Sequence, residues 1–264
     1  MLHRLEAKLI KIYQSLTYFL LWSTFFSVIL LFFRIRLEGK ENIPKRGRFI
    51  LAANHQNFFD GFLLAYPTGP TKRVSFVIAK RALKLKFSQI LARMIGSVMI
   101  SNGIEEYQRA LKKLNRVLSH GGRVGIFPEG DVSNHGLPRK FKGGVAKLSL
   151  DSNTKVVPVY LGGTYNLRCF KYWLKRPEIL IKIGEPIQLY NYAEVFGNNL
   201  EGMASFVREK IIELMDLKEI QLLEDLNSID SKSFVNVTMY NTPTREAVLE
   251  AQDKKDVLGS SLVN

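Results

Sequence analysis

Residues 123–136, RVGIFPEGDVSNHG, begin as an apolar run and become polar within a few positions. The run 123–127 has the length and composition of a strand, and Pro128 and Gly130 are residue types that end strands. Glycine in the following loop lets the backbone approach a ligand closely. The stretch therefore predicts a strand that leads into a binding loop, although an ordinary polar connection would have a similar composition.

The segment behind this strand carries polar and basic side chains, among them Ser133, Arg139 and Lys142. Positive charge and the free N–H groups at the start of a following helix both favour a bound anion. The alternative is that these side chains are only solvated, and the loop alone does not decide between the two readings.

Four further segments, 48–53, 74–79, 155–161 and 178–183, have the composition of strands. Helical patterns lie among them at 82–100, 102–120 and 202–217. In the second of these, Asn102 is a candidate cap and Gly121 a terminator. Alternating strands and helices predict an α/β fold with a mixed, mostly parallel sheet covered by helices. The basic, amphipathic pattern of 82–100 fits packing on the sheet better than lying on a membrane, but both readings stay open.

The chain has 264 residues, 46% of them hydrophobic, which is enough for one domain with a substantial core. Its net charge of +14 favours anionic partners such as nucleic acid, phosphorylated substrates or an acidic membrane surface. Nucleic acid is disfavoured, because it gives no reason for the apolar N-terminus. The single cysteine, Cys169, excludes an intramolecular disulfide and a cysteine-rich metal site.

No charged residue lies between Lys11 and Arg34, and this interval is just long enough to cross a hydrocarbon core of roughly 30 Å. Basic residues at its end, where a signal peptide would have a cleavage site, argue against a signal peptide. We therefore expect a hydrophobic membrane helix, either spanning or sunk into one leaflet. The more basic flank follows the helix, which predicts that the body of the protein is cytoplasmic.

These observations divide the chain into three parts. Residues 1–38 form the membrane-associated helix and its basic flank, 39–226 the folded domain, and 227–264 a polar tail that has few large apolar residues and is expected to be loosely held.

A second polar cluster, NHQNFFDG at 54–61, follows the predicted strand 48–53. His55 and Asp60 are five positions apart, which on a regular helix separates them by about 140°, so they can meet only if the chain turns between them. Asp60 could then hold one imidazole nitrogen and leave the other as a base for a hydroxyl. The alternative is a histidine satisfied by a local aspartate cap.

Taken together, the two clusters resemble the glycerolipid acyltransferase family typified by 1-acylglycerol-3-phosphate acyltransferases. The motifs that match, in the family's order, are Asn54, His55 and Asp60; the basic entry at Lys80; Phe-Pro-Glu-Gly at 127–130; Val-Pro-Val at 157–159; and Gly-Glu-Pro-Ile at 184–187. The resemblance covers roughly residues 35–190.

The resemblance implies an O-acyltransferase that moves a fatty acyl group from acyl-CoA or acyl-carrier protein to the free hydroxyl of a lysoglycerolipid. His55 would be the base and Asp60 its partner. Asn54, Lys80, Glu129 and Gly130 would join Ser133, Arg139 and Lys142 on the substrate side. Neither a metal nor a bound cofactor is implied; the expected partners are anionic membrane lipid, the lysolipid and the acyl carrier.

Two departures from the family's motifs concern the residues that would bind the acceptor. Phe-Pro-Glu-Gly usually continues Thr-Arg-Ser in the family, whereas here Asp131 and Val132 follow, and the arginine that commonly ends the second motif is also missing. Loss of an arginine and gain of an aspartate should weaken binding of a phosphomonoester unless Arg139, Lys140 or Lys142 compensates. The leading acceptor is 1-acylglycerol-3-phosphate, which would give phosphatidate. The alternatives are an acyltransferase or transacylase for another lysophospholipid or membrane alcohol, or a non-catalytic lipid-binding protein of the same fold.

Overall fold

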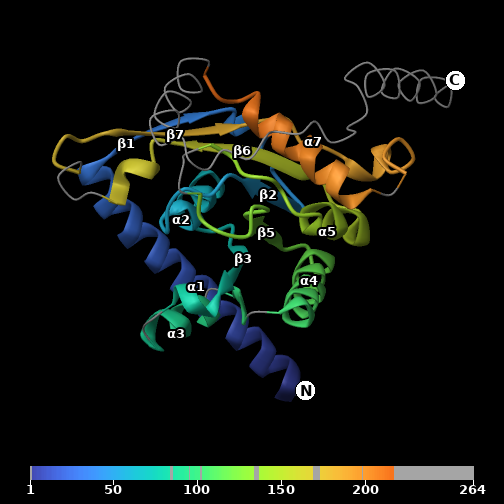
Figure 1. Cartoon of the computed structure of the whole chain (residues 1–264). Coiled ribbons are helices and arrows are strands. Elements are labelled where there is room, and N and C mark those ends of the chain that lie inside the picture. The colour runs from blue at the N-terminus through green and yellow to red at the C-terminus, as the bar shows by residue number, and fades with distance from the viewer. Residues whose placement is uncertain are drawn as a thin grey trace, which may run out of the picture.

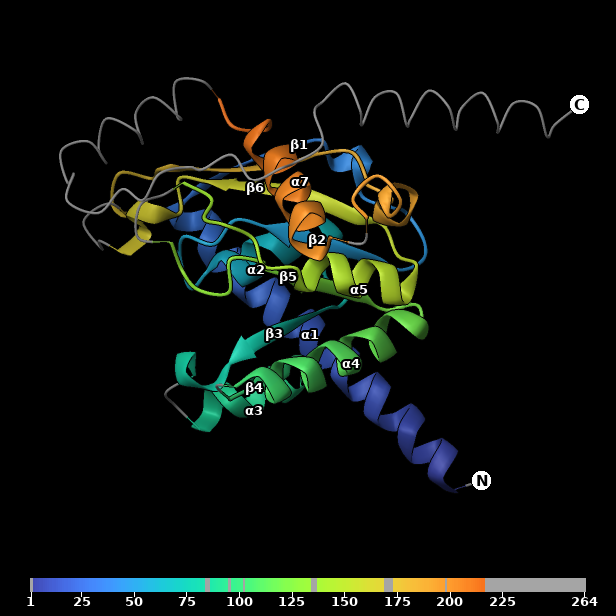
Figure 2. The same cartoon turned by 45° about the vertical axis from the view of Figure 1, so that its right-hand side comes forward.

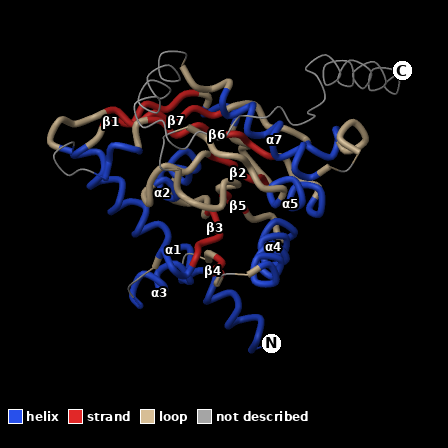
Figure 3. Tube along the Cα trace, viewed as in Figure 1, coloured by secondary structure: helices blue, strands red, loops and turns tan. Residues whose placement is uncertain are grey.

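The computed structural model describes residues 2–83, 86–94, 96–101, 103–133, 137–168, 173–197 and 199–216. Within them, seven strands form one sheet in the order β1-β7-β6-β2-β5-β3-β4 (Figures 1 and 3). The strands are β1 Arg34–Glu38, β2 Phe49–Ala53, β3 Val74–Ala79, β4 Val98–Ile100, β5 Arg123–Ile126, β6 Val156–Gly162 and β7 Glu178–Ile183. Neighbouring strands are parallel except β6 and β7, which are antiparallel. This confirms the predicted mixed, mostly parallel sheet.

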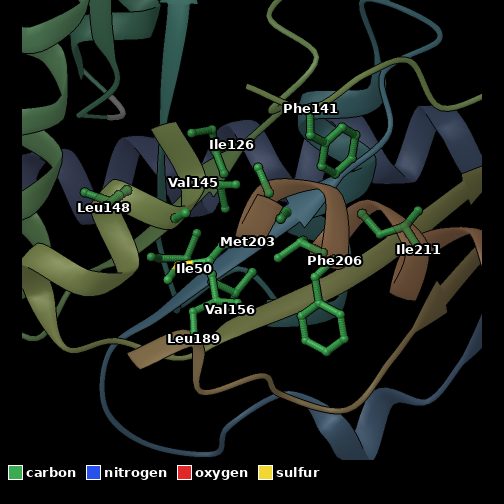
Figure 4. Close-up of a cluster of buried hydrophobic side chains, with 14 of the residues drawn as sticks. Ile50, Ile126, Phe141, Val145, Leu148, Val156, Leu189, Met203, Phe206 and Ile211 are labelled. Atoms are coloured by element: carbon green, nitrogen blue, oxygen red, sulfur yellow. The ribbon is translucent and has the colours of Figure 1, made fainter. Parts of the chain in front are cut away.

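The α-helices lie in two layers around the sheet (Figures 1 and 2). They are α1 Leu2–Phe32, α2 Asp60–Ala65, α3 Lys86–Met94, α4 Ile104–Ser119, α5 Gly144–Ser152 and α7 Leu200–Ile212. Side chains of α4, α5 and α7 pack on one face, in the cluster that includes Leu148, Met203 and Ile211 (Figure 4). Side chains of α1 and α2, such as Phe26 and Leu63, pack on the other.

Strand β2 shows why its sequence is apolar at every position. Ile50 and Ala52 face the cluster under α4, α5 and α7, whereas Phe49, Leu51 and Ala53 face the cluster under α1 and α2. All five residues are fully buried. A strand buried on both faces has no solvent side, so the period-two alternation of a half-exposed strand is absent.

The helix expected at 82–100 is wrong in extent. α3 ends at Met94, and Gly96 has a positive φ of 79°, a conformation that favours glycine and interrupts the helix. The chain then forms β4, which pairs with β3. The apolar residues that predicted one helix over 82–100 therefore belong to a helix and a strand.

Other element boundaries also moved. β1, β4, α2 and α5 were not predicted, and α7 begins at Leu200, capped by the Asn199 side chain, rather than at Gly202. α4 begins after Gly103, a residue without a capping side chain, and Asn102 lies outside the described residues. Gly121, at φ 76°, follows the end of α4 as expected. Cys169 and the tail 227–264 also fall outside the described residues, and the three-part division of the chain stays a prediction.

Helix α1 has two different faces. Phe26, Ile29 and Phe33 are at most 4% exposed, and Phe25 stacks on Phe62 of α2 at 4.2 Å between ring centroids. The opposite side exposes large apolar side chains, which are Leu9, Ile10, Ile12, Tyr13, Leu16, Phe19, Leu20, Val28, Leu30 and Leu31. The stretch Ile12–Phe32 is long and apolar enough to cross a membrane.

Candidate active site

Parallel pairing of β2 with β5 brings the two predicted clusters together. Ala52 is opposite Ile126 in the register, so the loops that follow both strands leave the sheet at the same edge. The His55 N–H donates to Glu129 Oε1 at 2.9 Å. The Ser133 N–H donates to the His55 carbonyl oxygen at 2.6 Å. The loop after β2 and the loop after β5 are thus joined by hydrogen bonds on both sides of His55.

The chain turns between His55 and Asp60, as a functional pair requires. Asp60 is the first residue of α2 and is fully buried, and its Oδ2 lies 2.9 Å from His55 Nδ1. The same oxygen accepts the backbone N–H groups of Gln56 at 2.5 Å and Asn57 at 2.6 Å. For Nδ1 to donate to the carboxylate it must carry the proton, which leaves Nε2 as the basic nitrogen.

Phe127, directly after β5, fixes the orientation of the His55 ring. Its ring stacks on that of His55 with centroids 4.1 Å apart and planes 17° apart. Phe76 continues the stack behind Phe127 at 6.4 Å. The aromatic position of the Phe-Pro-Glu-Gly motif therefore orients the histidine from a second direction, a role that the sequence reading did not give it.

Asn54 is engaged by the neighbouring strand. Its Nδ2 donates to the Leu161 carbonyl oxygen at 2.9 Å, and its Oδ1 accepts the Leu161 N–H at 2.8 Å. The side chain is fully buried. This geometry favours a role in fixing the end of β2 to β6 over the substrate contact expected from the resemblance.

Glu129 is buried beside the histidine, with 4% of its surface exposed. Burial raises its pKa to about 7, although the backbone amides and the charges of His55 and Arg139 act to lower it. Oε2 is buried and makes no hydrogen bond of good geometry among the described residues. Glu129 therefore supports the His55 backbone and titrates near neutral pH.

Gly130 allows a cation to lie directly over the loop. Its φ is 77°, and a Cβ atom there would fall 2.6 Å from Lys142 Nζ. The Lys142 N–H donates to the Pro128 carbonyl oxygen at 2.9 Å, which holds the lysine beside the motif. Ser133, 1% exposed, donates through Oγ to the Leu137 carbonyl oxygen at 3.0 Å and so braces the loop internally.

The cations after β3 are arranged differently from the expectation. Lys80 Nζ donates to Ser101 Oγ at 3.0 Å, at the end of the neighbouring strand β4. Arg81 forms an ion pair of 3.0 Å with Asp131, both side chains being more than half exposed. The repulsion expected from Asp131 is therefore offset by a partner that sequence reasoning missed, because the pair joins positions 50 residues apart.

A mixed, mostly parallel α/β sheet that holds a histidine against a buried aspartate at the strand ends is an arrangement suited to general-base chemistry. A family model described as Acyltransferase matches residues 34–162. The match agrees with the acyltransferase family that the motif resemblance predicted.

Two curated relatives are both named 1-acyl-sn-glycerol-3-phosphate acyltransferase. The protein of Borreliella burgdorferi is 28% identical over 195 residues, which are 71% of this chain and 74% of the relative. That of Bacillus subtilis is 23% identical over 181 residues, 68% and 87% of the two chains. The crystal structure of the 1-acyl-sn-glycerophosphate acyltransferase PlsC from Thermotoga maritima has a TM-score of 0.56 at 24% identity, with 84% of each chain covered, and shares the fold.

We predict that Glu129 makes stability fall as the pH rises. Because the folded pKa of about 7 lies above the ordinary 4.5, the folded protein holds a proton that the unfolded chain releases between these values. The stabilisation present below pH 4.5 is lost as the pH passes 7, by roughly 3 kcal/mol. Unfolding free energies of the wild type and Glu129→Gln, measured from pH 5 to 8, should diverge over this range. Parallel curves would contradict the prediction.

Proposed function

We propose that this protein transfers a fatty acyl group from acyl-CoA or acyl-carrier protein to the free hydroxyl of a lysoglycerolipid, with 1-acylglycerol-3-phosphate as the leading acceptor and phosphatidate as its product. The observation that carries the proposal is the contact of 2.9 Å between His55 Nδ1 and the buried carboxylate of Asp60. The names of the two curated relatives support the choice of acceptor.

The reaction needs a base but no covalent enzyme intermediate, because an acyl thioester is already activated. His55 Nε2 accepts the proton of the acceptor hydroxyl, and the hydroxyl oxygen attacks the thioester carbonyl carbon. The tetrahedral oxyanion then collapses, the carbon–sulfur bond breaks, and the imidazolium returns its proton to the leaving thiolate. Asp60 fixes the imidazole and stabilises its positive charge between these two proton transfers.

The acceptor phosphate would be held by three cations from two separate segments, the end of β3 and the segment 137–142. Lys142 lies over Gly130, Arg81 reaches Asp131 from the end of β3, and Arg139 is an exposed residue whose backbone faces Glu129. Lys80 is a weaker candidate, since it is engaged with Ser101. These cations would take over part of the role of the arginine that is replaced by Val132.

The same replacement favours a second candidate acceptor, a lysophospholipid whose phosphate is a diester. A diester carries one negative charge and needs fewer cationic contacts than a phosphomonoester. A non-catalytic lipid-binding protein is disfavoured, because such a protein has no need for a histidine held by a buried carboxylate.

Helix α1 would bind the membrane while remaining docked on the domain. Its buried face packs on aromatic residues of α2, so a helix that left the domain to cross the bilayer would expose that cluster. Its other face exposes apolar side chains along its length, which suits insertion into one leaflet. α3 lies beside α1 and exposes Ile90, which extends this surface. The cytoplasmic orientation rests on the basic flank alone.

We expect His55→Ala to lower transfer of labelled acyl-CoA to lysolipids in detergent by about 100-fold or more, because the base is removed. His120→Ala is the matched control, since His120 is an exposed histidine at the end of α4. Asp60→Asn should also lower the rate, through loss of the correct imidazole tautomer. Undiminished transfer by folded His55→Ala would overturn the assigned mechanism.

Val132→Arg should raise kcat/KM for 1-acylglycerol-3-phosphate by about tenfold relative to a lysophosphatidylcholine, because a charged donor is restored beside the loop. Val132→Leu, which adds bulk without charge, is the control. The absence of any gain, combined with loss of turnover in Arg139→Ala, would show that the downstream segment already supplies the missing contact.

Phe19 lies on the exposed face of α1 and Phe26 on its buried face, with 43% and 2% of their surfaces exposed. Phe26→Ala should lower the free energy of unfolding by about 3–5 kcal/mol, since it leaves a cavity under the helix. Phe19→Ala combined with Leu31→Ala should instead weaken binding to anionic lipid vesicles at unchanged stability, as judged by sedimentation. Equal vesicle binding by this double variant and the wild type would contradict the proposed membrane face.

A further inference from the structure

Arg208 of α7 contacts the segment 137–142, which follows the loop after β5. It lies outside residues 34–162, the range matched by the family model, and none of the motifs includes it. Its Nε donates to the carbonyl oxygens of Pro138 and Arg139, at 2.9 Å in each case. One side chain therefore holds two consecutive peptide groups of the segment that carries Arg139 and Lys142.

These contacts also determine where the Arg139 amide points. The carbonyl of Pro138 and the N–H of Arg139 belong to the same peptide group, which is planar and trans, so they point in opposite directions. Because Arg208 holds the carbonyl, the N–H faces the other way. On that side lies Glu129, and the Arg139 amide lowers the pKa of its carboxyl group.

Glu129 and Arg208 also lie close enough for the Glu129 charge to act on the guanidinium. The guanidinium is partly buried, which lowers its pKa, while the charge of Glu129 raises it. Glu129 in turn accepts the N–H of His55 at 2.9 Å. A continuous set of contacts thus runs from α7 through the 138–139 peptide and Glu129 to the backbone of His55.

We propose that Arg208 is a positioning residue for acyl transfer: it holds the segment 137–142 and the Glu129 carboxylate in the arrangement that the acceptor requires beside His55. The proposal rests on the proposed function for its kinetic part. Helix α7 contains no motif residue. The proposal nevertheless predicts that α7 affects recognition of the acceptor rather than of the acyl donor.

A second link between α7 and the same segment provides the control. Lys140 and Glu201 form an ion pair of 3.0 Å, with both side chains more than half exposed. Exposed pairs of this kind contribute little to stability. Glu201→Gln removes this surface link and leaves the contacts of Arg208 in place, so it separates a specific effect of Arg208 from a general loosening of α7.

The test compares Arg208→Gln and Arg208→Lys with Glu201→Gln and the wild type in detergent. We expect Arg208→Gln to lower kcat/KM for the lysolipid acceptor by 10- to 100-fold, mainly through a higher KM, with the KM for acyl-CoA unchanged. The Glu129 carboxyl should titrate at higher pH in Arg208→Gln, because a stabilising positive charge is lost. Arg208→Lys should keep the titration close to that of the wild type, and Glu201→Gln should change neither property.

The titration is followed by infrared difference spectroscopy of the carboxyl band that disappears in Glu129→Gln. It needs no turnover, so a wild-type protein that acylates no lysolipid would refute the proposed function while the titration still decides the role of Arg208. An unchanged acceptor KM together with an unchanged Glu129 titration in folded Arg208→Gln would overturn the inference. A decrease in kcat/KM for both substrates that only matches the loss of folded protein would also overturn the inference.

Discussion

The buried carboxylate of Asp60 is the constraint around which the site is built. A fully buried negative charge is costly unless several donors face it, and here one oxygen accepts from an imidazole and two backbone amides. Those donors can converge only if the chain between His55 and Asp60 wraps around the carboxylate. The start of α2 at Asp60 adds the favourable field of a helix N-terminus. The orientation of the His55 imidazole thus follows from the convergence of these donors on Oδ2 of Asp60.

The sheet supplies the second half of the site. Parallel pairing of β2 with β5 places the Phe-Pro-Glu-Gly loop beside His55, where Phe127 stacks on the ring and Glu129 accepts the backbone N–H. Both contacts come from the motif that was expected to bind the acceptor. The motif therefore carries two functions, since its first and third residues hold the histidine and its glycine opens space for Lys142.

The sequence predicted what depends on local patterns. Five strands, the turn to Asp60 and the meeting of the two clusters could be expected from apolar runs, turn residues and the rule that sites lie at strand ends. It could not predict β4, because Val98 continues the apolar stripe of the helix expected at 82–100. Arg81 and Arg208 were also missed, since their partners are 50 residues away in one case and about 70 in the other. Long-range polar pairs leave no periodic signal.

The loss of the motif arginine has a structural consequence beyond one missing contact. An arginine within the loop after β5 would join acceptor recognition to the same loop that contacts His55. In this chain the cations beside the loop lie instead at the end of β3 and in the segment 137–142, and Arg208 of α7 holds that segment. Under the proposed function, recognition of the acceptor would depend on how these elements are held together. Since the His55–Asp60 contact does not involve them directly, acceptor preference could change under the proposed mechanism while the orientation that Asp60 gives to the His55 imidazole stays the same.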